Sequence, residues 1–90
     1  MRLGEFDALF AHGLTDQERL SPTVLRWTLD PRAEQTARGL TARETACCCF
    51  FTFGFMVDGN AVHLDVEVPS AQVEVLDALA ARASAGLAAA

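Results

Sequence analysis

The fold is decided by the stretch at residues 50–68, FFTFGFMVDGNAVHLDVEV. Apolar residues occupy every second position on either side of Asp58-Gly59-Asn60, as in two half-buried strands. Asp-Gly accepts the left-handed backbone that a tight hairpin turn needs. The stretch therefore predicts an antiparallel hairpin of strands 50–57 and 61–68. On its second strand, the residues expected to point inward are Val62, Leu64, Val66 and Val68, and those expected to point outward are His63, Asp65 and Glu67.

The segment before this hairpin predicts a further strand and a helix. Residues 24–30 alternate, with Leu25, Trp27 and Leu29 on one face. Asp30-Pro31 then opens a helix that we expect to run to about residue 48, because Asp caps free amides and Pro suits the first helical position. Residues 15–22 are polar and are expected to form a turn.

The two ends of the chain predict helices. Residues 5–12 form a short amphipathic helix that Gly13 closes. Ser70 is expected to cap the last helix, whose apolar residues recur at helical spacing from residue 73 to residue 83. Residues 84–90 are expected to be a frayed tail.

Together these elements predict a single α+β domain over residues 1–90, with a short helix followed by β-α-β-β-α. The strands at 24–30 and 50–57 are joined by a helix, so we expect them to be parallel with a right-handed crossover. Placing strand 61–68 between them gives a three-stranded mixed sheet in the order 1-3-2 with two helices on one face, a truncated ferredoxin-like arrangement. The other face is expected to be open, or covered by the N-terminal helix or by a second subunit, and a homodimer is predicted.

Composition excludes several classes of protein. A hydrophobic share of 51% with 21% charged residues is typical of a globular domain and not of a disordered one. A net charge of −5 argues against a nucleic-acid partner, which needs a basic surface. We expect no membrane partner, because no apolar run approaches the roughly 20 residues of a bilayer span. The N-terminus lacks a signal-peptide core, so a cytoplasmic location is expected.

Three consecutive cysteines, at 47–49, are the most unusual feature of the sequence. A secreted disulfide scaffold spreads its cysteines along the chain to close loops, so reduced thiols or metal thiolates are expected here. Helical spacing aligns Glu44 and Cys48 with the apolar Leu40, and Cys47 follows Glu44 by three residues. A carboxylate on such a buried stripe is costly unless it is paired, protonated or coordinated.

The sequence therefore predicts a soft-metal or metalloid site for Hg(II), Cu(I), Zn(II) or trivalent arsenic, because thiolates select soft ions. Cys47 and Cys48 would be ligands, and Glu44 would be a third ligand or a proton acceptor. A soft metal ion is the one cofactor expected, and the predicted role is binding or sensing. No catalytic residue is assigned, because a helix C-terminus and a neighbouring carboxylate both raise a thiol pKa.

Several alternatives stay open. The cysteines can be small buried hydrophobes, with Glu44 bonded to Arg43, Arg26 or a free backbone amide. The chain can be a metal-free module that dimerises through its open sheet face, or a small enzyme that uses Glu44 and a cysteine. The outward row of the hairpin, which begins at His63, is expected to be a solvated face, although a histidine with two carboxylates also suits a metal or acid–base work.

The motif at residues 44–53, ETACCCFFTF, resembles an E-x-x-C-C-x-F-F-x-F motif of small bacterial proteins. Similar segments follow the DNA-binding part of MerR-type metal-responsive regulators, and the likeness extends over roughly residues 24–83. The resemblance implies a ligand-sensing or metal-sensing role centred on Glu44, Cys47 and Cys48. Cys49 departs from the motif, and no helix-turn-helix precedes the domain, so DNA binding is not carried over.

Overall fold

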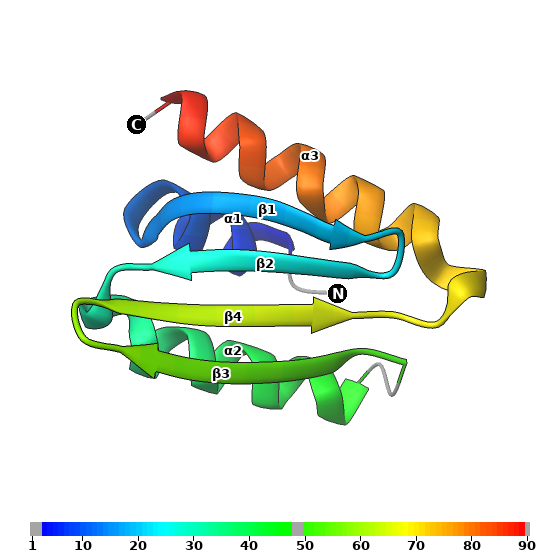
Figure 1. The fold of residues 1–90 in the computed structure, drawn as a ribbon, viewed down its shortest axis with the longest axis horizontal. Helices are drawn as coiled ribbons and strands as arrows, with labels where there is room; N and C mark the ends of the chain where they lie inside the picture. The colour runs from blue at the N-terminus through cyan, green and yellow to red at the C-terminus, as the bar shows by residue number, and fades with distance from the viewer. Residues whose placement is uncertain (1–2, 48–49, 90) are drawn as a thin grey trace.

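The computed structural model describes residues 3–47 and 50–89 and confirms the α+β class. A four-stranded sheet packs against three helices (Figure 1). In chain order the elements are α1 (Leu3–His12), β1 (Leu14–Ser21), β2 (Val24–Leu29), a 3₁₀ turn (Pro31–Ala33), α2 (Glu34–Cys47), β3 (Thr52–Asp58), β4 (Ala61–Glu67), a second 3₁₀ turn (Ser70–Gln72) and α3 (Val73–Ala89).

The sheet differs from the predicted three-stranded mixed sheet. Its order is β1-β2-β4-β3, and every neighbouring pair is antiparallel. The additional strand β1 comes from residues that were predicted to be a polar turn. That prediction was wrong because β1 lies at an edge of the sheet with mostly exposed side chains, so burial imposes no apolar alternation on it. Backbone pairing with β2 holds it instead, with Gln17 opposite Trp27.

The three described helices all lie on one face of the sheet, and within residues 3–47 and 50–89 the other face has no helix over it (Figure 1). Two helices were predicted there, and α1 joins them. Helix α2 lies behind β3 and β4, whereas α1 and α3 pack against each other near β1 and β2. The open face therefore consists of the outward side chains of the four strands.

The core centres on Trp27, which is fully buried and touches two rings of α1. Its ring centroid lies 4.9 Å from that of Phe10 and 6.1 Å from that of Phe6. Alternation predicted the inward faces of β2 and β4 correctly. The buried strand residues include Leu25, Trp27, Leu29, Val62, Leu64 and Val66. Burying these side chains is the main stabilising term of a domain of this size.

Of the two helix caps predicted from the sequence, Asp30 is confirmed and Ser70 is not. Asp30 caps the first 3₁₀ turn, with its carboxylate accepting from the backbone N–H of Arg32 at 2.8 Å, as predicted. The predicted cap at Ser70 was wrong, because Pro69 holds the cap position and makes no side-chain cap bond. Proline has no polar side-chain atom, so its contribution is the fixed backbone angle that begins the turn.

The segment predicted as a frayed tail is helical through Ala89. A Cβ atom added to Gly86 would lie 2.7 Å from the Cβ atom of Phe10, so glycine permits α3 to approach α1 closely. Leu87 also packs against the core, and Arg82 pairs with Asp7 at 2.6 Å. These contacts give the last turns of α3 a partner, which explains why they stay helical.

Candidate functional site

Glu44 is the most unusual residue of the described structure. It lies near the end of α2, on the stripe that also buries Ala37, Leu40 and Thr41, and its exposed fraction is 0%. Neither carboxylate oxygen has a hydrogen-bond partner within residues 3–47 and 50–89. Thr41 on the same stripe donates to the carbonyl of Ala37 at 2.9 Å, as buried polar groups normally do. Glu44 therefore departs from a rule that its own neighbour obeys.

The predicted pairings of Glu44 do not form. Arg43 turns to α1 and donates to Glu5 at 2.8 Å, and Arg26 is bound to Asp65 across the sheet. Both guanidinium groups considered as partners are thus engaged elsewhere. The prediction that Glu44 is buried is confirmed, but neither Arg43 nor Arg26 explains its burial.

Of the three cysteines, Cys47 alone lies among the described residues. Cys47 is the last residue of α2 and is exposed, so the prediction that it shares the buried face was wrong. The spacing of Cys47 continues the apolar stripe of α2. A side chain is buried only where a neighbouring element covers it, however, and that cover ends before Cys47. Cys48 and Cys49 lie outside the described residues. In the described part of the chain no three metal-ligating side chains cluster. Glu44 and Cys47 share the last turn of α2, one buried and the other exposed.

The outward row of β4 is a partnered face. Arg26 donates twice to Asp65, at 2.7 and 2.9 Å, and these hydrogen bonds hold the pKa of that carboxyl below its usual range. The Nδ1 atom of His63 lies 3.2 Å from the hydroxyl of Thr28. This row is tied to β2 by cross-strand contacts, in agreement with a structural role.

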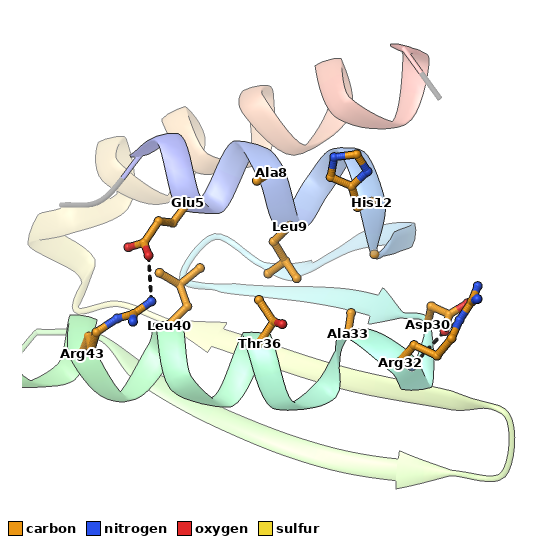
Figure 2. Close-up of a pocket in the computed structure, with 11 residues that line it drawn as sticks. Glu5, Ala8, Leu9, His12, Asp30, Arg32, Ala33, Thr36, Leu40 and Arg43 are labelled. Carbon is orange, nitrogen blue, oxygen red and sulfur yellow. Dashed lines mark hydrogen bonds and ion pairs between the residues drawn. The ribbon is translucent and has the colours of Figure 1, made fainter.

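A groove lies between α1 and α2, and the sequence did not predict it. Its volume is about 650 Å³, and Figure 2 shows its walls, with Leu9 and Ala8 from α1 facing Leu40, Thr36 and Ala33 from the α2 side. Glu5 and Arg43 pair across one end. The groove arises from the relative placement of two helices that are separate in the sequence, so residue spacing on either helix does not reveal it.

Comparison with protein families, curated proteins and solved structures gave no match. Of the helices that the structure describes, none is both long and apolar enough to cross a bilayer.

Proposed function

We propose that this chain is a small cytoplasmic protein that binds or senses a soft metal or metalloid ion at the end of α2. Cys47 and Cys48 would supply thiolates, and Glu44 would supply a carboxylate oxygen or accept a proton. The observation that carries the proposal is the Glu44 carboxylate, which is fully buried and lacks a hydrogen-bond partner in the described segments. Such a group costs about 1–3 kcal/mol or more of stability. Local costs of this kind are expected at functional sites.

The donor set suits soft ions. Thiolates prefer Hg(II), Cu(I), Zn(II) and similar ions over hard cations, and the ion itself displaces the thiol proton on binding. The exposure of Cys47 gives an incoming ion access from solvent. Glu44, one helical turn before it, would then contribute a negative charge that a bound cation compensates.

Mercury retention against a competing monothiol tests the proposal. We expect the wild-type protein to keep one Hg(II) in native mass spectra recorded with excess glutathione, because two protein thiolates chelate the ion and glutathione supplies one thiol at a time. Cys47→Ser/Cys48→Ser should lose that ion completely. Cys49→Ser is the matched control and should keep it.

Equal retention by the double variant and the wild type would contradict the assignment of Cys47 and Cys48. Glu44→Gln separates the role of the carboxylate from that of the thiols. If Glu44 is a ligand, this variant should lose Hg(II) at a lower glutathione concentration than the wild type. An unchanged midpoint would remove Glu44 from the ligand set.

A metal-free dimeric module is the second candidate, and the exposure of the sheet favours it. Met56 is 56% exposed on the uncovered face, where it lies opposite His63 of β4. An exposed large apolar residue on an open sheet face suits contact with a second copy. Sedimentation of wild type and Met56→Glu at several concentrations distinguishes this candidate. It requires a concentration-dependent dimer that the substitution abolishes, without any need for a metal.

A further inference from the structure

The groove between α1 and α2 has an apolar floor and fixed ends. Leu9 and Leu40 are buried at its base, and the small side chains of Ala8 and Ala33 leave the space open (Figure 2). A volume of about 650 Å³ falls within the range of small-molecule pockets, roughly 300–1,000 Å³. The floor therefore suits an apolar body.

The two ends set the length of the groove. At one end Gly13 and Ala33 lie so close that a Cβ atom on Gly13 would be 2.6 Å from that of Ala33. At the other end the ion pair of Glu5 and Arg43 bridges the helices, as the dashed line in Figure 2 shows. The lining residues of α2 and its 3₁₀ turn run from 32 to 43, which is about 16 Å at the helical rise. An extended chain of eight to ten carbons is shorter than this and fits within the groove.

The bridged end carries hydrogen-bond donors that suit an anion. Arg43 donates one hydrogen bond to Glu5 at 2.8 Å, and its side chain is 52% exposed. A guanidinium carries five N–H donors in a planar fork that matches a carboxylate, so donors beyond the one bound to Glu5 remain on a side chain that lines the groove. The acidic group at the opposite end, Asp30, already accepts from the backbone N–H and the guanidinium of Arg32. Asp30 is thus engaged by Arg32, while Arg43 keeps donors for a ligand.

We infer that this groove is a binding site for a small amphipathic carboxylate, with its chain on Leu9 and Leu40 and its carboxylate on Arg43. The site is separate from the proposed metal site, because neither Glu44 nor Cys47 lines it. The Glu5 carboxylate occupies part of Arg43 in the described structure and would compete with the ligand for it.

Octanoate and 1-octanol are the probes, because they differ only in the charged group. In ¹⁵N-correlation spectra, octanoate should shift the amides of α1 and of residues 32–43 saturably. Ala8→Trp should abolish these shifts by filling the groove. Ala78→Trp is the matched control, since Ala78 is exposed on α3 outside the groove, and should leave them unchanged.

Two charge variants test the head-group assignment. Arg43→Gln should weaken octanoate about fivefold and leave octanol unaffected, because one partly exposed charge-assisted contact is lost. Glu5→Gln should tighten octanoate, since a competing carboxylate is removed. The double cysteine variant should bind octanoate like the wild type, so failure of the metal proposal leaves this result untouched.

Three results would overturn the inference: no saturable shifts with octanoate, shifts that persist in Ala8→Trp, or octanol binding as tightly as octanoate. The first two would remove the site, and the third would remove its preference for an anion. Circular dichroism of each variant verifies that the fold is retained before binding is compared.

Discussion

Two polar side chains that pack against this small core, one half-buried and one fully buried, differ in their hydrogen bonding. Between β1, β2 and α3, the side-chain amide of Gln17 makes hydrogen bonds through both its oxygen and its nitrogen. Its Oε1 accepts from the indole N–H of Trp27 at 2.7 Å, and its Nε2 donates to the carbonyl of Ala80 and the hydroxyl of Ser84. On α2, the carboxylate of Glu44 is at least as deeply buried and has no hydrogen-bond partner among the described residues.

Gln17 shows how the fold supplies hydrogen-bond partners to a polar group that contributes to stability. The buried Trp27 is given an acceptor, and that acceptor is itself anchored to α3. A buried carboxylate without such support lowers stability, so its presence calls for a role other than packing. The same substitution, to leucine, should therefore change stability in opposite directions in the two regions.

The largest effect is expected at Glu44. Glu44→Leu should raise the free energy of unfolding by about 2 kcal/mol, because an apolar side chain of similar size replaces an unpaired polar one. Urea unfolding with chelator and reductant present measures it. Glu44→Gln is the control and should gain less, since an unpaired amide remains. A loss of stability in Glu44→Leu would mean that the carboxylate has a structural partner.

A somewhat smaller effect of opposite sign is expected at Gln17. Gln17→Leu should lower the free energy of unfolding by about 1.5 kcal/mol, because the buried indole N–H of Trp27 loses its acceptor. The same urea experiment measures it. Thr15→Val, which removes an exposed bond from the same strand to the carbonyl of Thr28, should cost little. Equal losses of stability in Gln17→Leu and Thr15→Val would contradict this explanation. They would show that any substitution in β1 lowers the free energy of unfolding by this amount.

The smallest effect concerns Asp65, a half-exposed carboxylate that does have a partner. Asp65→Asn should lower Tm by about 3 °C at neutral pH, as expected for a partly exposed ion pair. Because the bond to Arg26 lowers the pKa of Asp65 in the folded state, its stabilisation is present above the ordinary value of 3.8 and is lost as pH falls through the lowered value. Thermal unfolding of both proteins from pH 7 to pH 2 should show the difference shrinking below pH 3.8. A difference that is constant over this range would contradict the ion-pair explanation.

Sequence periodicity predicted the parts of the fold where burial dictates the residue type. β2, β4 and the stripe of α2 each bury one face, so their apolar spacing reveals them. β1 escaped prediction because an edge strand is held by backbone bonds that any residue can make. The placement of α1 beside α3 escaped it for a similar reason, since Gly86 and Phe10 reveal their contact only in three dimensions.

The sequence predicted only part of the candidate site, as it predicted only part of the fold. Helical spacing placed Glu44 in the core correctly, because spacing fixes the direction of a side chain. It placed Cys47 there wrongly, because direction does not tell whether another element is present to cover a helix end. The groove between α1 and α2 could not be read from spacing at all, since it depends on how far apart two helices sit.

The close packing of α1 on α3 has a consequence for the order of folding. Asp7 meets Arg82, and Phe10 meets Gly86, across more than seventy residues. Helix α1 therefore meets this neighbour only after the residues up to about Gly86 have been synthesised. Until α3 is made, the side of α1 that packs against it stays exposed on the nascent chain.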